Sequence, residues 1–463
     1  MPGLFMSADD PRLADFLAAH PALQQVELVL TDPNGIPRGK WAPVATLKKA
    51  FGDGVNFPLS LHGLDIWGSE VAATGLHIES GDRDGFCVAV PETLAALPWS
   101  DGELVGAVQA TTAQVMLETL TPEGDGFGGC SRTVLRRAVE RLAADGLTAV
   151  CAVELEFHLL TLEARTGAPF VVAETDAAFD NTHMYDLEAL AEKAPVFAAI
   201  RRAAAWAGVP IDTVVKEAGP GQYEVNLTHR ADPLRAADDA VQLRRIVTEA
   251  ARQYDMVATF MAKPFSEHPG NGMHVHISLL DEAEQNIFAA EDGPARQRHA
   301  VAKLLETMAE TTLIFINTWN GFRRVAPGSY APTRANWGDN NRSVALRLPA
   351  APPAARRIEH RVAGADANPY LLLAVLLEGM RQGLQAGNEP PPGLTGNAYD
   401  RATPNRGGRL PSSMADALEL FEGSAFAKRA LGDEMHHIIC ALKAAELATF
   451  NAHVSDFERA TFV

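Results

Sequence analysis

The sequence of 463 residues predicts an α+β protein in which a small β-rich amino-terminal domain precedes a larger domain of mixed helices and strands. Three observations lead to this prediction. Residues 24–117 read mostly as short strands separated by turns, and EGDGFGGC at 123–130 is a glycine-rich linker. Beyond the linker, helical and extended patterns alternate to the end of the chain. We therefore expect one domain over residues 1–122 and a second over residues 123–463.

The amino-terminal domain is expected to contain two hairpins. VELVL at 26–30 is followed by the turn sequence DPNG and a second extended run, which is typical of a hairpin. IESGDRDGFCVAV at 78–90 repeats the pattern, and VQATTAQVML at 108–117 reads as one further strand.

The larger domain is expected to start with a helix over 133–146, where apolar residues recur at helical spacing and Gly146 ends the run. AVCAVELEFHLL at 149–160 then reads as a strand. Further helices are predicted near 186–208, 232–253, 297–318, 368–386 and 413–449, and further strands near 222–228, 257–263, 273–280 and 343–348.

The composition narrows the class of protein. Net charge is −18, whereas a nucleic-acid-binding protein usually carries clustered positive charge. The four cysteines form no CxxC motif, which argues against a zinc knuckle or a disulfide framework. We see no signal peptide and no run of about 20 apolar residues, so we expect a cytoplasmic protein that binds neither nucleic acid nor membrane.

Two glutamates and two histidines are placed as metal ligands would be. Glu154 and Glu156 project from the same face of the predicted strand, and adjacent carboxylates repel each other unless cations hold them. An exposed edge of alternating charge is the alternative, but the flanking residues are apolar. His274 and His276 also share one strand face, where an ordinary hydrogen-bonded core pair is the alternative. Carboxylates mixed with imidazole suit Mg²⁺ or Mn²⁺ better than structural zinc.

Two other segments add charged groups to this picture. In KEAGPGQYEVNL, the Gly-Pro-Gly turn brings Glu217 near Glu224, which begins a new strand. In RIEHR, Arg357 and Arg361 flank Glu359 on one strand face. Arginines suit bound phosphate or carboxylate, although any single one of them is equally compatible with a structural salt bridge. Further arginines occur nearby in the sequence, at positions 323, 324, 342 and 347.

These motifs together resemble those of the glutamine synthetase superfamily, over nearly the whole chain. The segments that carry the resemblance occur in the family's order: ELEF, GQYEVNL, GNGMHVHISL, NNRSVALRLP and RIEHR followed by NPYL. The resemblance implies a β-grasp-like amino-terminal domain and a glutamine-synthetase-type catalytic domain whose antiparallel strands form a funnel. It also implies a homo-oligomer, expected to be a dodecamer of two stacked hexameric rings with active sites between subunits.

The resemblance further implies two or three Mg²⁺ or Mn²⁺ ions per active site, with ATP as co-substrate. One ion would be held by Glu156, Glu217 and Glu224, and another by Glu154, His274 and Glu359. ATP would contact His276, Ser278 and Arg347, and glutamate would contact Gly270, Arg324 and Arg361. Arg342 would meet the transferred phosphoryl group. The implied reaction converts the γ-carboxylate of glutamate into γ-glutamyl phosphate, from which a nitrogen nucleophile displaces phosphate.

The nitrogen donor is the point at which this sequence departs from ammonia-using glutamine synthetases. Those enzymes carry a glutamate in a loop resembling PGYEAP, whereas this chain reads PGSYAP and places Tyr330 there. A phenol cannot attract ammonium as a carboxylate does, but it offers an aromatic wall to an organic amine. The exchange resembles the branch that glutamylates amines, including γ-glutamylpolyamine synthetases.

Asp65, in GLDIWGSE, is the candidate for binding the amine and accepting its proton, reaching in from a neighbouring subunit. A simple turn residue is the alternative. Trp67 and Trp337 are candidates for the pocket wall, although core tryptophans would look the same.

We therefore expect a ligase for glutamate and a polyamine. A monoamine ligase, a glutamine synthetase using ammonia and a catalytically silent relative are the alternatives.

Overall fold

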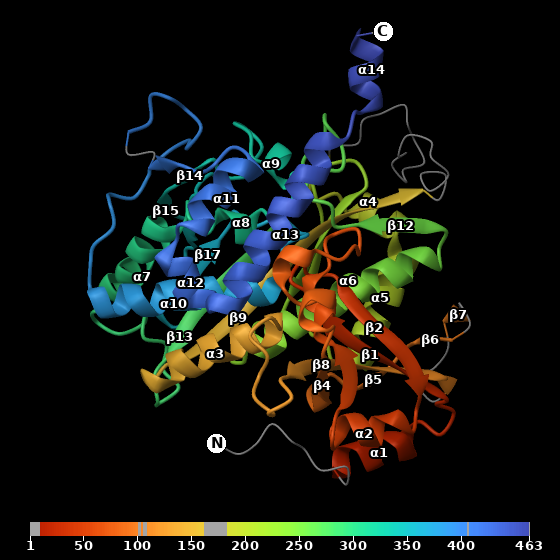
Figure 1. Ribbon diagram of the computed structural model, residues 1–463. Coiled ribbons are helices and arrows are strands. Elements are labelled where there is room, and N and C mark those ends of the chain that lie inside the picture. Colours follow the sequence, from red (N-terminus) through yellow and green to blue (C-terminus); the bar gives the residue numbers. More distant parts are fainter. Residues whose placement is uncertain (1–9, 101–102, 105–108, 162–182, 405–406, 463) are drawn as a thin grey trace.

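Two large sheets organise the chain, and each takes its strands from a separate stretch of sequence (Figure 1). The computed structural model describes residues 10–100, 103–104, 109–161, 183–404 and 407–462. Every strand of the first sheet lies before residue 121, and every strand of the second lies after residue 147. The predicted α+β class is confirmed, whereas the domain boundary at residue 122 stays a prediction.

The first sheet has six strands in the order β2-β1-β8-β4-β3, with β5 paired to β8. Only β1 and β8 run parallel. Its strands are β1 (Gln25–Thr31), β2 (Pro37–Pro43), β3 (Val55–Pro58), β4 (Asp84–Ala89), β5 (Ala95–Ala96) and β8 (Thr112–Leu120). Helices α1 (Pro11–Ala19) and α2 (Thr46–Phe51) share its apolar core.

The first predicted hairpin is confirmed and the second is wrong in its first arm. β1 pairs antiparallel with β2 around the DPNG turn, where Gly35 adopts φ +78°. Residues 78–80 instead form a short 3-10 helix, and β4 pairs with β3 and β8. The reason is local, because Gly81 and Asp82 both take positive φ values that a strand cannot continue through.

The second sheet has eight strands in the order β10-β11-β9-β13-β17-β16-β15, with β12 paired to β9. All pairs are antiparallel except β15 with β16. Its strands are β9 (Thr148–Thr161), β10 (Ile211–Lys216), β11 (Gln222–Leu227), β12 (Met256–Thr259), β13 (Met273–Leu280), β15 (Trp337–Asp339), β16 (Leu346–Leu348) and β17 (Ile358–His360). Two shorter pairs, β6 (Trp99–Ser100) with β7 (Glu103–Leu104) and β14 (Arg334–Ala335) with β18 (Gly408–Arg409), lie outside both sheets.

One face of β9 is buried, and the other carries Glu154 and Glu156. From Ala149 to Phe157 every second side chain is fully buried, and those between are partly exposed. The buried face packs against α3 (Ser131–Ala144) and α6 (Pro233–Arg252), and α10 (Pro369–Ala386) packs against both helices. Burial of Val153, Leu155 and Phe157 contributes about 1.5–3 kcal/mol for each side chain, so this face fixes the orientation of the strand.

Three predicted helices are divided in the structure. Residues 187–207 form α4 (Leu187–Glu192) and α5 (Ala194–Ala207), because Pro195 starts a new helix. The next divided segment forms α7 (Gly293–Thr307) and α8 (Thr312–Phe315), followed by α9 (Gly321–Arg324). The predicted helix at 413–449 forms α11 (Met414–Glu422), α12 (Ala425–Leu431) and α13 (Asp433–Ala452), and α14 (Asp456–Phe462) follows it. Among the described helices, none is both long and apolar enough to cross a bilayer.

Candidate active site

The acidic and imidazole side chains predicted as metal ligands meet on the partly exposed face of the second sheet. Glu224 of β11 lies directly opposite Glu156 of β9. His274 of β13 lies directly opposite Glu154 on the other side of β9. Opposed residues of antiparallel strands have Cβ atoms about 4.5–5.5 Å apart, so the register brings all four side chains into one cluster.

The same face continues over β13, β17 and β16. His276 is opposite Glu359, and Glu359 is opposite Arg347. Ser278 follows at the next position on this face of β13 and is half-buried. His274 and His276 therefore share one face of β13, as the alternation in HVHIS predicts.

Glu217 joins the cluster from the turn between β10 and β11. Its backbone N–H donates to the carbonyl of Gln222 at 2.9 Å, which closes the turn. The buried ammonium of Lys216 donates to the carbonyls of Glu217 at 2.8 Å and Gly219 at 2.7 Å. Burial and the nearby carboxylate of Glu156 raise the pKa of Glu217 to about 7.

Hydrogen bonds fix the two histidines against Glu154. His276 Nε2 donates to Glu154 Oε1 at 2.8 Å, and His274 Nδ1 lies 3.3 Å from Glu154 Oε2. Arg357 Nε donates to His276 Nδ1 at 3.1 Å, which leaves Nε2 as the nitrogen directed at Glu154. Both rings are thereby held in a defined orientation.

The pKa values of the carboxyl groups diverge within this small space. Burial and repulsion from the other carboxylates raise the pKa of Glu224 to about 9. Burial also opposes ionisation of Glu154, but the hydrogen bonds from His274 and His276 outweigh it and lower the pKa. For Glu359 the opposing effect of burial is outweighed by nearby cations, Arg361 foremost, and its pKa falls to about 2.

The donor set fits hard divalent cations. Two triplets have ligand atoms within 4.8 Å of one another: Glu154, His276 and Glu359, and Glu154, Glu224 and His274. Carboxylates with an occasional imidazole suit Mg²⁺ or Mn²⁺. Burial and mutual repulsion raise the pKa values of Glu217 and Glu224, and a divalent cation bound among these carboxyl groups would favour their ionised forms.

These triplets divide the ligands differently from the sequence prediction. Glu154 belongs to both, and His276, predicted to face ATP, shares one with Glu359. Glu156 accepts a hydrogen bond from the backbone N–H of Gly272 at 2.7 Å. The predicted pairing of ligands with individual ions stays a prediction.

Buried arginines border the carboxylate cluster. Arg324 and Arg361 are each 5% exposed. Arg361 and Arg347 both pair with Glu359, the latter at 2.7 Å. A Cβ atom at Gly272 would lie 2.5 Å from Arg324 Nη2, and one at Gly270 would lie 2.9 Å from Arg324 Cγ. These two glycines therefore let the chain pass close to a buried guanidinium group.

The predicted residues Arg342, Tyr330 and Asp65 lie outside the metal-ligand cluster. Arg342 is exposed, and its charge acts on Glu217. Tyr330 is 67% exposed and has φ +57°, a left-handed backbone conformation. Asp65 Oδ1 accepts from the backbone N–H groups of Trp67 at 2.9 Å and Ser69 at 2.8 Å. Asp65 therefore shapes a turn in this chain, and its role in the amine step stays a prediction.

The two candidate wall tryptophans have different surroundings. Trp67 is 50% exposed, and its ring stacks on that of Trp319. Trp337 is 8% exposed and donates from Nε1 to the carbonyl of Pro391 at 2.7 Å. Of these two tryptophans, only Trp67 has ring surface exposed enough to contact a ligand.

Sequence reasoning missed a tyrosine beside the site. The phenol of Tyr399 donates to the carbonyl of Ala331, the neighbour of Tyr330, at 3.1 Å. Burial raises the pKa of Tyr399 to about 12, although the charges of Arg324 and Arg361 oppose this shift. Tyr399 lies in an irregular segment, where no periodic pattern marks it.

A polar network behind the cluster was also missed. Gln222 Nε2 donates to the carbonyl of Gly270 at 3.0 Å and to Asn271 Oδ1 at 3.2 Å. His158 Nδ1 lies 2.9 Å from the same oxygen of Asn271. The network fixes the loop that precedes β13. In the sequence, the only indication of this network was the presence of polar residues within otherwise apolar strands.

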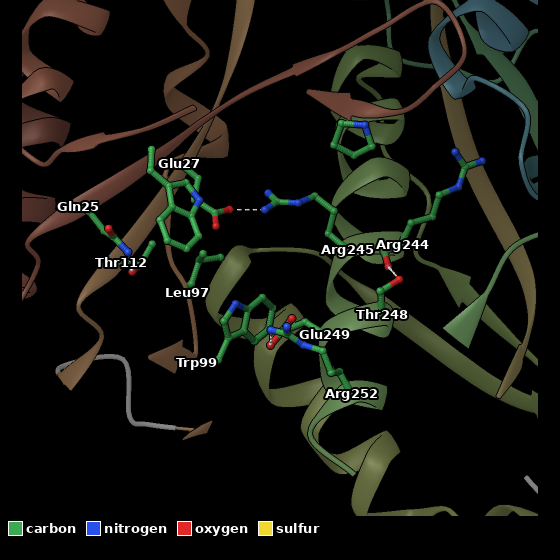
Figure 2. Close-up of a pocket in the computed structure, with 12 residues that line it drawn as sticks. Gln25, Glu27, Leu97, Trp99, Thr112, Arg244, Arg245, Thr248, Glu249 and Arg252 are labelled. Atoms are coloured by element: carbon green, nitrogen blue, oxygen red, sulfur yellow. Dashed lines mark hydrogen bonds and ion pairs between the residues drawn. The ribbon is translucent and has the colours of Figure 1, made fainter. Parts of the chain in front are cut away.

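The cavity shown in Figure 2 is separate from this cluster. It has a volume of about 510 Å³ and lies between the first sheet and α6. Arg245 points across from α6 to pair with Glu27 of β1 (Figure 2). Its described lining contains none of the site residues predicted from the sequence.

Comparison with known proteins agrees with the geometry. Residues 128–462 match the glutamine synthetase catalytic domain. The chain is 37% identical over 458 residues to γ-glutamylputrescine synthetase PuuA of Escherichia coli (strain K12), across 98% of this chain and 94% of that protein. It is 29% identical over 460 residues to a glutamate–isopropylamine ligase of a Pseudomonas species, across 98% of this chain and 97% of that protein. A solved GmaS/ADP complex superposes with a TM-score of 0.82 at 25% identity, across 97% of this chain and 99% of that chain.

Proteins of this kind generally use ATP and divalent metal ions and are oligomeric. The acidic cluster supplies donors for such ions, and the bordering arginines supply positive charge for anionic substrates. The chain belongs to the glutamine synthetase family and is a carbon–nitrogen ligase that uses ATP.

Proposed function

We propose that this chain joins the γ-carboxylate of L-glutamate to an organic amine through γ-glutamyl phosphate, and that its amines are di- or polyamines such as putrescine or spermidine. The observation that carries the proposal is the segment PGSYAP, in which the resemblance implies that Tyr330 stands where ammonia-using family members carry a glutamate. Its relatives named as glutamate–amine ligases support the same conclusion. A monoamine is the second candidate, because one of these relatives is named for isopropylamine.

The position of Tyr330 supports this role. Its loop is tied to Tyr399, which lies within the electrostatic influence of Arg324 and Arg361. The loop that carries Tyr330 is therefore connected, through Tyr399, to the region proposed to bind glutamate. A neutral aromatic ring contacts the alkyl chain of an amine and interacts with a second ammonium group, whereas it offers no carboxylate to a lone ammonium ion.

Two or three Mg²⁺ or Mn²⁺ ions are proposed to occupy the acidic cluster. Their ligands are proposed to be Glu156, Glu217 and Glu224 on one side and Glu154, His274 and Glu359 on the other. Bound there, the ions would neutralise the phosphates of ATP and the charge that develops during phosphoryl transfer.

The chain's own groups are proposed to orient the reactants. Arg324 and Arg361 hold the carboxylate groups of glutamate beside Gly270. Arg342 meets the transferred phosphoryl group, and the remaining contacts to ATP come from His276, Ser278 and Arg347. Buried arginines suit this task because guanidinium groups bind carboxylate and phosphate through paired hydrogen bonds.

Asp65 is proposed to bind the amine and accept its proton. An alkylamine with a pKa near 10 is mostly protonated at neutral pH and attacks only after losing a proton. Asp65 acts in the active site of a neighbouring subunit, within a dodecamer of two hexameric rings. We propose a cytoplasmic location for this assembly.

Exchange of Tyr330 tests the proposal. Tyr330→Glu should raise the ratio of ammonium to putrescine turnover at least tenfold, because it restores a carboxylate for ammonium. Tyr330→Phe is the matched control and should keep the preference for amines, since it retains the ring. The measurement is steady-state phosphate release with each nitrogen donor. An unchanged ratio in Tyr330→Glu would remove the observation on which the proposal rests.

A further inference from the structure

Helix α13 buries two charged side chains that face the amino-terminal sheet. Lys443 is 1% exposed and Glu446 is 0% exposed. Lys443 Nζ lies 2.8 Å from Glu446 Oε2, so the pair is neutral as a unit. Desolvating two charges is costly, and their attraction offsets that cost only when further hydrogen bonds satisfy the remaining polar atoms. The further hydrogen bonds of Lys443 and Glu446 therefore show which segments this buried pair holds in place.

Glu446 holds two segments of the amino-terminal region. Its Oε1 accepts from Asn34 Nδ2 at 2.9 Å and from the backbone N–H of Ile66 at 2.9 Å. Asn34 lies in the turn between β1 and β2, and Lys443 donates to its Oδ1. The carboxylate of Glu446 therefore binds the peptide unit that joins Asp65 to Ile66.

The opposite end of the same peptide unit is held by a second charged residue. Arg38 Nη2 donates to the carbonyl of Asp65 at 3.2 Å. Arg38 Nε donates at 2.9 Å to Asp32 Oδ2, and the Asp32 side chain is fully buried. The peptide between Asp65 and Ile66 thus has its C=O bound by a guanidinium group and its N–H bound by a carboxylate. Such charge-assisted bonds are about twice as strong as neutral ones.

The residue that follows this peptide is anchored to the same helix. The ring of Trp67 stacks on Trp319 with centroids 5.3 Å apart, and Trp319 stacks on Phe450 of α13 at 4.7 Å. Asp65 Oδ1 is itself bound by two backbone N–H groups of the turn. Rotation of the 65–66 peptide would therefore displace the Asp65 carboxylate together with its turn.

We propose that Arg38 and Glu446 are positioning residues that fix the orientation of the Asp65 carboxylate for amine binding. The inference rests on the proposed role of Asp65 in the amine step. The 65–66 peptide is held by two charged side chains that lie 27 and 380 residues away in the sequence. Neither residue touches the amine, and both act through the backbone of Asp65. Misplacement of a reacting group by about 1 Å costs about 100-fold in rate.

The test separates the amine step from phosphoryl transfer. Arg38→Met should lower kcat/KM for putrescine at least tenfold and leave KM for glutamate and ATP within twofold of the native value. Phosphate release that depends on glutamate but not on amine should be unchanged, because it does not use Asp65. Arg38→Lys should recover part of the loss. Arg38→Met also leaves the buried carboxylate of Asp32 without its guanidinium partner, so Tm is measured for both Arg38 variants and Arg38→Lys serves as the charge-retaining control.

Glu446→Gln should produce the same pattern, with a lower Tm because Lys443 loses its partner. Glu378→Gln is the matched control, because Glu378 is another buried helical carboxylate and binds Arg141 and Arg381 instead. It should lower Tm and leave kcat/KM for putrescine within twofold. An equal loss of amine turnover in this control would mean that general destabilisation explains the effect, and would overturn the inference.

A double-mutant cycle with Asp65→Asn decides whether these residues act through Asp65. If they do, Arg38→Met should cause little further loss in the Asp65→Asn background. Equal losses in both backgrounds would overturn the positioning role. A loss in Asp65→Asn with a fully active Arg38→Met would overturn this inference alone. Unchanged amine turnover in Asp65→Asn would overturn the proposed role of Asp65 and this inference with it.

Discussion

Metal binding should release protons from the acidic cluster, because two of its carboxyl groups retain protons when no cation is near. Burial and neighbouring carboxylates raise the pKa of Glu224 to about 9. Burial and Glu156 raise the pKa of Glu217 to about 7. A divalent ion bound by these groups requires them to be deprotonated.

The number of protons follows from these two values. Raised pKa values of about 9 for Glu224 and about 7 for Glu217 keep the first mostly protonated and the second partly protonated at pH 7, so saturation with metal should release about one to two protons. The release should be about two protons at pH 6 and smaller at pH 8.

Isothermal titration calorimetry with Mg²⁺ or Mn²⁺, in two buffers of different ionisation enthalpy at each pH, measures this release. Glu224→Gln should remove about one proton at pH 7, provided that the variant still binds metal. A release below about 0.3 proton, or one that does not change between pH 6 and pH 8, would refute the reasoning.

The same carboxyl groups link stability to pH. Both have pKa values raised above the ordinary value of 4.5, so their contribution to the stability of the metal-free fold is greatest below pH 4.5. That contribution is lost as the pH rises through about 7 and then about 9. Mg²⁺ should therefore raise Tm more at pH 8.5 than at pH 6, and an increment that does not depend on pH would contradict this linkage.

Three further substitutions test other parts of the structure. Gly272→Ala places a Cβ atom 2.5 Å from Arg324 Nη2 and should raise KM for glutamate about tenfold, whereas an unchanged KM would argue against Arg324 as a glutamate contact. Tyr399→Phe removes the 3.1 Å hydrogen bond to Ala331 and should raise KM for the amine about two- to tenfold, with KM for ATP as the internal control. Leu155→Ala empties a fully buried position of β9 and should lower the free energy of unfolding by about 2–5 kcal/mol in urea titrations, and a loss below 1 kcal/mol would contradict the packing described.

The alternating pattern of the long strand made the acidic cluster predictable. VELEF places apolar residues at odd positions and glutamates at even ones, and the structure buries the odd set. The face to which each side chain of this strand points thus follows from the sequence alone. The register that sets His274 opposite Glu154 does not, because it depends on contacts between segments 120 residues apart.

Other features depend on interactions that no local pattern records. The carboxyl-terminal helical pattern is broken twice, where Ser424 caps a new helix and Gly432 takes φ +86°. Both residue types also occur inside longer helices, so the breaks were not apparent from periodicity. Tyr399 and the bonds around Asp65 join irregular segments to distant helices, and their roles emerge only from the tertiary fold.

The most direct test of the central claim is phosphate release from ATP, Mg²⁺ and glutamate with a panel of nitrogen donors. The panel comprises ammonium, methylamine, ethanolamine, putrescine, spermidine, spermine and aniline, and mass spectrometry identifies each amide product. We predict strong turnover with the di- and polyamines and at least 100-fold lower kcat/KM with ammonium. A monoamine as the best substrate would keep the ligase mechanism and contradict the assignment of polyamines. Preference for ammonium would contradict the account of Tyr330 and identify a glutamine synthetase.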